Sequence, residues 1–453
     1  MSSRLRKQTI ERTGVRCHPQ LPLEEKKVAH ALVPLLIICL TYAMPVGCHT
    51  STISTTNGLA QSESQLTLSR QERLNLFEEI WQTINSDYYD PNFHGVDWVA
   101  VRERYRPRIE AAANDQEVYA LCETMLATLR DAHTVFNKPE ASSREQKQKG
   151  SAGLSIGEVE GKTVVLSVDP DSDAFHAGVA PGMILRTVND RPVDQIYAQI
   201  RSEFAGSSTE RALKNLMQGA LLYADFLGAS RKLEFEGFNH EKLTVMITHR
   251  GPLDDSPVLI GRRLEWGFGY IKFDQWQPPI VAQFRKELGK LLDTPGLILD
   301  LRGNGGGQTN VLLDIAGNFF SKDVSFGDFK GRNGSIERIT THRVAQPYQG
   351  AVVILVDELS ASASEVFTAA MQEHARARVV GSQTCGCVLN QTSKTLSRGI
   401  LRWSSRVYFS PQGRLLEGSG ITPDTIVKLT ISDLQHHRDK GLQAAERLLK
   451  ETL

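Results

Sequence analysis

Residues 352–387 read VVILVDELSASASEVFTAAMQEHARARVVGSQTCGC and decide the fold of the second half of the chain. The apolar run 352–356 predicts a buried strand, and apolar residues at helical spacing over 366–375 predict a helix. Ser362 therefore lies at a strand-to-helix corner, where free backbone N–H groups and the helix dipole favour a nearby oxyanion. Ser362 and Glu365 also fit a capping box, which is the plain structural interpretation of the same residues.

Strands and helices alternate on both sides of this corner. The pattern predicts further strands over 269–273 and 297–301 and further helices over 281–292, 310–320 and 442–453. This alternation indicates a mixed α/β core over residues 252–453, in which ligands bind at the carboxyl ends of the strands. DLRGNGGG, residues 300–307, follows one of these strands, and its glycines permit close backbone approach to a ligand. It lacks the lysine and the spacing of a phosphate-binding loop, so we discount a nucleotide.

The segments before the core differ in composition. Residues 1–50 combine basic residues with a short apolar run, as in a signal peptide, and PVGC ending at Cys48 resembles a bacterial lipoprotein processing site. Ser, Thr and Gln residues over 51–70 predict a flexible linker. Apolar residues at helical spacing predict a small helical domain over 71–150. Residues 151–251 alternate short apolar strands with turns, with a partly helical insertion near 204–231.

Charge and cysteine content exclude several classes of function. Lys plus Arg equal Asp plus Glu at 52 each, so nothing indicates a nucleic-acid partner, and a membrane contact is expected only through the N-terminal signal or a lipid on Cys48. The cysteines are too few for a disulfide framework, and a bridge between Cys385 and Cys387 is expected to be strained. Cys385, Cys387 and His133 do not have zinc-site spacing, so we predict no metal and no cofactor.

Several motifs together resemble one protease family. SASASE followed by an AAMQ-type helix, a VVG turn and a T-x-G segment resembles the nucleophile region of the carboxy-terminal processing, or tail-specific, peptidases of the S41 serine peptidase family. DAHTVF at 131–136, LILDLRGNGGG at 297–307 and EGSGITPD at 417–424 resemble other family segments in the same order, and 153–193 resembles a PDZ domain. The resemblance covers most of the chain after about residue 70. It implies an exported serine endopeptidase that cleaves unfolded or tail-exposed polypeptides.

The chain departs from this family at the general base. Processing peptidases carry a catalytic lysine in T-x-G-K, but this chain ends the corresponding segment with Cys387, whose short and mostly neutral thiol cannot replace it. The tricorn-core branch of the family uses serine, histidine and glutamate, and it resembles this chain better. That resemblance implies Ser362 as nucleophile, His133 as base and Glu417 as the group that orients the histidine directly or through another polar residue.

The same resemblance implies the remaining site residues. The backbone N–H of Ala363 and that of Gly306 or Gly307 would form the oxyanion hole. Gln391 stands where processing peptidases carry a glutamine beside their lysine, and its role here is left open. The PDZ-like block would bind a substrate tail by adding it to a sheet edge. The expected contacts are Gly153, Leu154, Ile156 and Gly157.

A second interpretation is a catalytically inactive binding or scaffold protein with the same fold, which would use the PDZ-like block. His133 would then cap a loop, and Glu417 would be a solvated turn residue. The retention of Ser362, His133 and Glu417 together favours the enzyme.

Overall fold

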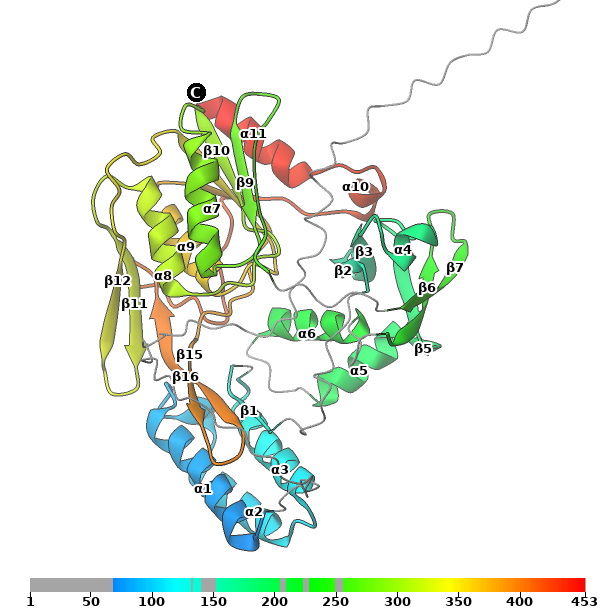
Figure 1. The fold of residues 1–453 in the computed structure, drawn as a ribbon, viewed down its shortest axis with the longest axis vertical. Helices are drawn as coiled ribbons and strands as arrows, with labels where there is room; N and C mark the ends of the chain where they lie inside the picture. Colours follow the sequence, from blue (N-terminus) through cyan, green and yellow to red (C-terminus); the bar gives the residue numbers. More distant parts are fainter. Residues whose placement is uncertain are drawn as a thin grey trace, which may run out of the picture.

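The computed structural model of this chain describes residues 68–131, 133–139, 152–203, 209–222, 228–248 and 256–452. The predicted signal peptide and Cys48 lie outside these residues, as does nearly all of the predicted linker. Figure 1 shows three parts, which we name the helical region (residues 68–137), the β module (residues 152–248) and the core (residues 256–452). None of the helices in the described ranges combines the length and the apolar character that crossing a membrane requires.

The helical region contains three helices and a short final strand. Ser69 begins the first helix with a capping box, because its N–H donates to the carboxylate of Glu72 (2.7 Å) and its hydroxyl accepts the N–H of Glu72 (3.3 Å). Asn114 caps the third helix by accepting the N–H of Glu117 (3.0 Å). The elements are α1 Arg70–Asp87, α2 Trp98–Ala111, α3 Asp115–Ala127 and β1 Val135–Asn137.

The β module is a twisted antiparallel sheet with three helices. Its strand order is β2-β3-β4-β6-β7, so β2 and β7 are the edge strands, and the short β5 pairs with β4. Leu154, Ile156 and Gly157, which are among the expected tail contacts, belong to edge strand β2. The elements are β2 Leu154–Val159, β3 Lys162–Val168, α4 Asp173–His176, β4 Ile184–Val188, β5 Arg191–Pro192, α5 Val193–Glu203, α6 Glu210–Leu222, β6 Ser230–Glu236 and β7 Lys242–Thr248.

The core is built on a six-stranded sheet in the order β17-β14-β13-β10-β9-β8, parallel except for β8. All five residues of β10 are buried, as expected for a parallel strand covered on both faces. Helices α7, α8 and α9 cover one face, and α11 covers the other. The strands are β8 Leu259–Arg263, β9 Gly269–Phe273, β10 Gly296–Asp300, β13 Ala351–Val356, β14 Arg378–Gly381 and β17 Thr425–Ile426. The helices are α7 Pro278–Gly289, α8 Thr309–Ala316, η3 Gly317–Phe319, α9 Ala363–Glu373, α10 Ile431–Gln435 and α11 Lys440–Thr452.

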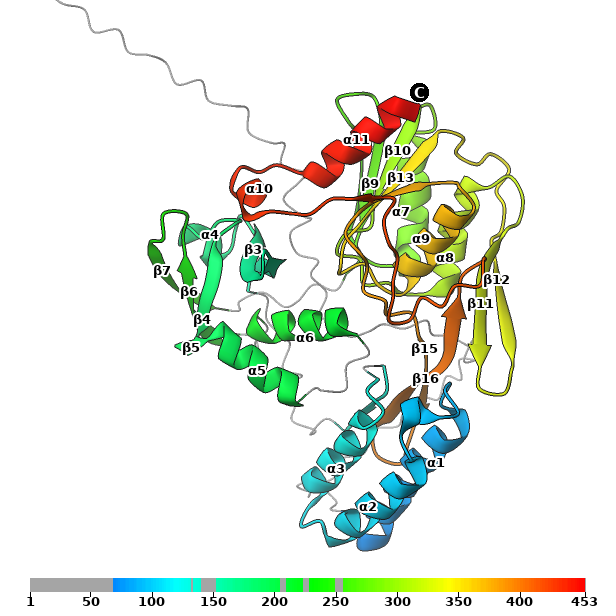
Figure 2. The same ribbon diagram turned by 180° about the vertical axis from the view of Figure 1, so that it is seen from behind.

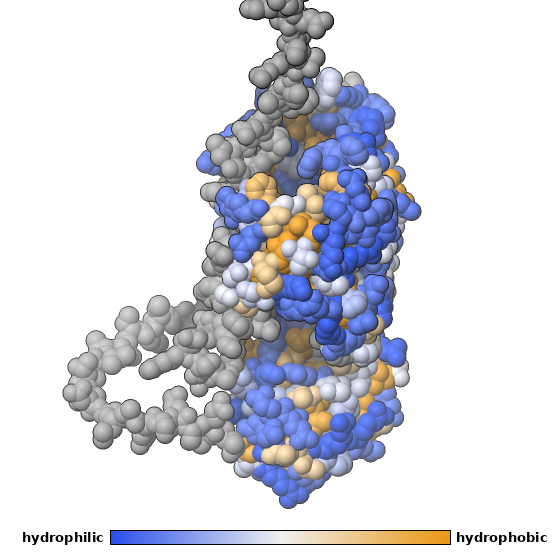
Figure 3. All heavy atoms as spheres, turned by 90° about the vertical axis from the view of Figure 1, so that its right-hand side faces the viewer, coloured by the Kyte–Doolittle hydropathy of each residue, from blue (hydrophilic) through white to orange (hydrophobic). Residues whose placement is uncertain are grey.

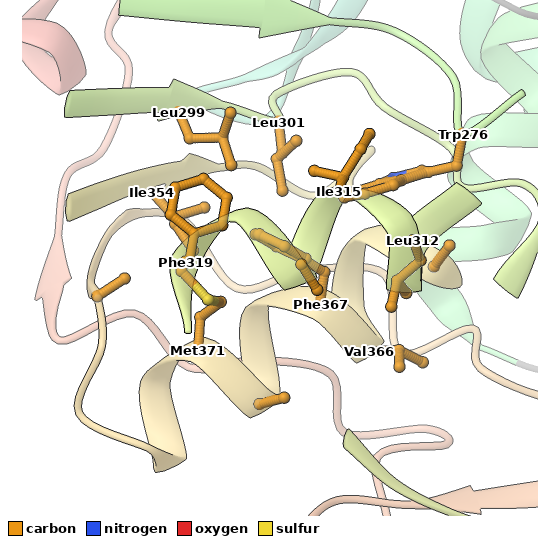
Figure 4. Close-up of a cluster of buried hydrophobic side chains, with 14 of the residues drawn as sticks. Trp276, Leu299, Leu301, Leu312, Ile315, Phe319, Ile354, Val366, Phe367 and Met371 are labelled. Atoms are coloured by element: carbon orange, nitrogen blue, oxygen red, sulfur yellow. The ribbon is translucent and has the colours of Figure 1, made fainter. Parts of the chain in front are cut away.

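Figure 4 shows the apolar layer between this sheet and its three covering helices. Trp276 packs edge-on against Phe273 and, tilted, against Phe367 of α9, with ring centroids 4.8 and 5.1 Å apart. The indole N–H of Trp276 donates to the hydroxyl of Ser364 (2.8 Å), so this layer also fixes the first turn of α9. The strand-to-helix corner at Ser362, which the sequence predicts, is therefore supported by a packed apolar layer.

A second sheet joins the core to the helical region. Its order is β1-β16-β11-β12, and β15 also pairs with β16; the strands from the core are β11 Ser325–Gly331, β12 Ile336–Thr340, β15 Asn390–Thr395 and β16 Ile400–Phe409. In Figures 1 and 2 the β15–β16 hairpin extends from the core to α1 and α3. Leu396, Leu401 and Trp403 of this hairpin are buried in the same apolar cluster as the three helices. The helical region therefore shares a hydrophobic core with a hairpin that begins more than 250 residues after the end of β1.

The β module contacts the core through α10, near the C-terminal end of the chain. Ile431 and Leu434 of α10 pack against Val159, Val164 and Ile184 of the module. Figure 3 views the molecule from the β-module side and shows a mostly hydrophilic surface with small apolar areas. Such scattered apolar residues are normal for a folded domain.

Candidate active site

Ser362 occupies the N-terminal end of α9 in a backbone conformation that is rare for a residue with a side chain. Its φ is 52° and its ψ is −117°. A non-glycine residue in such a region is held there by its surroundings and frequently marks a functional site. Its N–H donates to the carbonyl of Cys387 (3.0 Å) and to the carboxylate of Glu365 (3.1 Å). Within the described part of the chain its Oγ is buried and has no hydrogen-bond partner.

Glu365 does more than cap α9. Ser362 and Glu365 have the reciprocal arrangement of a capping box, but only the half from the Ser362 N–H to the Glu365 carboxylate has hydrogen-bond geometry. The same buried carboxylate accepts the Thr384 hydroxyl and the N–H groups of Gly386 (2.7 Å) and Cys387 (2.9 Å). Burial raises the pKa of Glu365, and these hydrogen bonds oppose that shift. Glu365 thereby ties the 384–387 loop to the nucleophile corner.

The glycine loop after β10 packs directly against this corner. A Cβ atom on Gly306 would lie 2.7 Å from the Cβ of Ser362 and 3.0 Å from the backbone N of Ala363, so glycine is required there. Asn304 connects the two segments, because its carbonyl accepts the N–H of Ala361 (3.1 Å) and the hydroxyl of Ser364 (2.9 Å). The sequence prediction does not include Asn304. Its only sequence signal is a polar residue among glycines after a buried strand.

The three predicted oxyanion donors differ in availability. The N–H of Gly306 donates to the side-chain oxygen of Asn304 (3.0 Å), so it is already used inside the loop. Among the described residues, no acceptor is found for the N–H groups of Ala363 and Gly307. Ala363 and Gly307 stay predicted oxyanion donors, whereas the N–H of Gly306 is engaged inside the loop.

A partly buried ion-pair network anchors the start of the glycine loop. Arg302 forms ion pairs with Asp300 (2.6 Å) and Asp439 (2.8 Å), and Asp300 also accepts the hydroxyl of Tyr270 (2.7 Å). Burial opposes the charge of Asp300, but Arg302 and Lys272 hold the pKa of this carboxyl below its ordinary range. Asp300 and Arg302 of the DLR segment therefore hold the glycine loop in place.

His133 lies in the turn between α3 and β1. Its side chain is 1% exposed, and its Nδ1 lies 3.6 Å from a carboxylate oxygen of Asp131. The same oxygen of Asp131 accepts the backbone N–H of His133 (2.8 Å), and the other accepts the hydroxyl of Thr134 (2.6 Å). The side-chain amide of Gln391, on β15, donates to the carbonyl of His133 (2.6 Å). Gln391 thus contacts the backbone of the predicted base, and neither this contact nor that of Asp131 is evident from the sequence.

Glu417 follows β16 and reaches the same region from the core. One carboxylate oxygen accepts the N–H of Val388 (2.8 Å), and the other is buried without a hydrogen-bond partner among the described residues. Burial raises the pKa of Glu417 to about 7, and the nearby His133 acts in the opposite direction. The charges of Asp131 and Glu365 add to the upward shift. The charges of His133 and Asp131, from the helical region, and of Glu365, at the Ser362 corner, therefore all act on the carboxyl group of Glu417.

Cys385 and Cys387 are joined by a disulfide in the structure. Their Cα atoms are 5.3 Å apart, within the usual range for disulfides. The residue between them, Gly386, has a φ of 73°, and a glycine adopts this left-handed conformation without penalty. The carbonyl of Cys385 accepts the hydroxyl of Thr209 (3.2 Å) and a guanidinium N–H of Arg211 (3.1 Å). The β module therefore touches the loop that supports Ser362.

The residues predicted to bind a substrate tail lie at the edge of the β module. Leu154, Ile156 and Gly157 belong to edge strand β2, and Gly153 precedes it with a φ of 65°. Ile156 is buried in the module, so it can offer a ligand only its backbone. A cavity of about 490 Å³ lies between the module and the core, and its walls include Ser155, Leu166, Lys272 and Arg302. Ser362, His133 and Glu417 do not line this cavity.

Comparisons with known proteins match this chain to families of proteases. Residues 267–427 match the model of peptidase family S41, and residues 69–127 match the model of the tricorn protease C1 domain. The chain is 27% identical over 401 residues to the carboxyl-terminal-processing protease of Synechocystis sp., which covers 86% of this chain and 90% of the relative. It is 28% identical over 368 residues to carboxyl-terminal-processing peptidase 2, chloroplastic, of Arabidopsis thaliana, covering 77% of this chain and 68% of the relative.

The fold is also found among solved structures. The photosystem II D1 C-terminal processing protease matches 83% of this chain and 97% of its own length, with a TM-score of 0.57 and 21% identity. The regions matched by the two family models include the nucleophile corner, the glycine loop and the helices that precede His133. Residues 267–427 belong to peptidase family S41, and together with the carboxyl-terminal-processing relatives this match makes the chain a serine-type peptidase.

Proposed function

We propose that this chain is an exported endopeptidase that cleaves unfolded or tail-exposed proteins through an acyl-enzyme on Ser362. The observation that carries the proposal is the corner itself. A buried serine with an unbonded hydroxyl stands in a rare backbone conformation, and the N–H groups of Ala363 and Gly307 beside it have no protein acceptor among the described residues. These are the parts that acyl transfer needs, a nucleophile and donors for the oxyanion.

In the proposed mechanism, His133 acts as the general base. Ser362 Oγ attacks the carbonyl carbon of the scissile peptide bond while its proton passes to the imidazole of His133. The N–H groups of Ala363 and Gly307 bind the oxyanion of the tetrahedral intermediate. The imidazolium then gives its proton to the leaving amine, and the same base activates the water that hydrolyses the ester. Glu417, whose charge acts on His133, is the third catalytic residue that the family resemblance implies.

The substrate tail is proposed to bind at the β module, as in a PDZ domain. Strand β2 is an edge strand, so its outer backbone groups can pair with an extended peptide. α6 of the same module contacts the 384–387 loop through Thr209 and Arg211. A tail bound at β2 would therefore lie on the module that contacts the 384–387 loop next to Ser362.

Export is proposed from the N-terminal sequence. Residues 1–50 have the basic and apolar pattern of a signal peptide, and Cys48 follows a small residue as in a lipoprotein processing site. The disulfide between Cys385 and Cys387 is consistent with an oxidising compartment. The proposed location is the periplasm or the cell envelope, with a lipid on Cys48 as the possible anchor.

The test compares the purified chain with its Ser362→Ala variant on an unstructured protein substrate. We expect the variant to lose at least about 10⁴-fold in turnover, because the other site residues cannot replace the nucleophile. Ser419→Ala, which removes an exposed serine near Glu417, serves as the control and should cleave normally. Labelling by a serine-directed fluorophosphonate should follow the same pattern. Equal cleavage by Ser362→Ala would contradict the proposal, and a folded wild type without cleavage would favour the binding-protein interpretation.

A further inference from the structure

We propose that Asp131 is the positioning residue for the base, orienting His133 from the Nδ1 side so that Nε2 is the nitrogen that acts on Ser362. This inference rests on the proposed function, in which His133 is the general base. It assigns to Asp131 the orienting role that the family resemblance gives to Glu417.

The contact between the two side chains carries the inference. A carboxylate oxygen of Asp131 lies 3.6 Å from Nδ1 of His133, and the same oxygen accepts the backbone N–H of His133 at 2.8 Å. Both residues are buried, at 3% and 1% exposure, so water does not compete for the contact. At 3.6 Å the two atoms are just beyond hydrogen-bond distance, and catalytic hydrogen bonds that are long or poorly aligned in a resting site tighten in the transition-state complex. A carboxylate at Nδ1 is the arrangement that fixes the tautomer of a general-base histidine.

Asp131 is itself held on its other side. Its second oxygen accepts the hydroxyl of Thr134 (2.6 Å), and that hydroxyl accepts the N–H of Ser404 on β16 (3.2 Å). The N–H of Thr134 donates to the carbonyl of Asp131 (3.1 Å), which closes the turn. A carboxylate fixed at both oxygens cannot rotate away from the imidazole.

Charge also distinguishes Asp131 from Glu417. Burial opposes ionisation of Asp131, but its contacts with His133, Ser404 and Thr134 lower its pKa to about 2. The pKa of Glu417 is raised to about 7, mainly by burial. At neutral pH Asp131 is therefore fully ionised, whereas Glu417 is partly protonated. Only a permanently ionised neighbour stabilises the imidazolium that forms during each turnover.

The experiment is Asp131→Asn, which keeps the size and one acceptor but removes the charge. We expect kcat to fall by about 10³- to 10⁴-fold with little change in KM, because the change acts on the transition state. The acidic limb of the pH–rate profile should move to lower pH, since the imidazolium loses its stabilising charge. Asp90→Asn is the matched control: it removes a charge that also acts on Tyr88 and Tyr89, and its carboxylate likewise caps a turn. It should retain activity near wild type.

A second measurement reads the tautomer of His133 directly, and its first arm uses a chain that keeps Asp131. ¹⁵N NMR of His133 in the inactive Ser362→Ala chain should show the neutral ring protonated at Nδ1, with a downfield proton resonance that disappears in Asp131→Asn. A ring protonated at Nε2 would overturn the inference, as would a kcat for Asp131→Asn equal to that of Asp90→Asn. A larger kcat loss in Glu417→Gln than in Asp131→Asn would return the orienting role to Glu417. Activity that survives Ser362→Ala would instead refute the proposed function.

Discussion

The nucleophile half and the base half of the site are built in opposite ways. Ser362 stands on a parallel sheet, and its supports, Glu365, Asn304 and Gly306, lie within about 60 residues of it in the sequence. His133 stands in a four-residue turn, and its carbonyl is held by Gln391, which is 258 residues away. The first half is a rigid product of one domain. The second exists only where the helical region and the β15–β16 hairpin meet, so the two halves should respond differently to mutation.

The most damaging change to the nucleophile half, apart from loss of Ser362, is predicted to be Glu365→Ala. It leaves the N–H groups of Ser362, Gly386 and Cys387 and the hydroxyl of Thr384 buried without this acceptor. Buried groups without partners cost about 1–3 kcal/mol each, so we expect a loss of about 4 kcal/mol in the free energy of unfolding. Urea unfolding measures it. Glu365→Gln, which keeps one acceptor, should lose less, and equal stability of all three chains would contradict the role given to Glu365.

An effect of intermediate size is predicted for the pH dependence of the free energy of unfolding. Glu417 and Asp131, the two carboxylates near His133, are expected to contribute to it in opposite directions. The pKa of Glu417 is raised to about 7, so the folded chain binds a proton that the unfolded chain releases, and stability falls as pH rises from about 4.5 to 7. The expected loss is about 3 kcal/mol. Glu417→Gln should remove this dependence, measured as urea midpoints at several pH values. Asp131, with a pKa lowered to about 2, contributes stability that is lost only as pH falls below about 4.

The smallest effect is predicted for Gln391→Met, which tests the long-range support of the base half. The variant removes the hydrogen bond to the carbonyl of His133 but keeps the side-chain length. We expect a loss of about 1 kcal/mol in unfolding free energy and about a tenfold fall in kcat, because the turn is less well fixed. Ser393→Ala, an exposed change on the same strand, is the control. If Gln391→Met and Ser393→Ala gave the same kcat, the turn would not need this contact.

The same contrast explains how much the sequence could predict. The strand before Ser362 lies at Ala351–Val356, and the glycine loop follows β10, because local apolar runs and glycines determine both. The helix predicted at 366–375 begins earlier, at Ala363, because the free N–H groups of its first turn carry no apolar signal.

The base half could not be predicted in the same way. The pairing of β1 with β16 and the contact of Gln391 with His133 join segments that no local pattern connects. Asp131 stands two residues before His133, but a sequence does not show which atoms of a turn face each other. The disulfide between Cys385 and Cys387 depends on the backbone at Gly386, which is likewise invisible in composition.

The β15–β16 hairpin also sets the moment in the synthesis of the chain at which it can first cut. The ribosome makes His133 early, but Gln391 and the residues 400–402 that pair with β1 follow only after more than 250 further residues. A growing chain therefore carries its base long before the strands that position it, and Ser362 also comes late. We expect the nascent chain to stay inert until it is nearly complete. The order of the sequence thus delays proteolysis without a separate inhibitor.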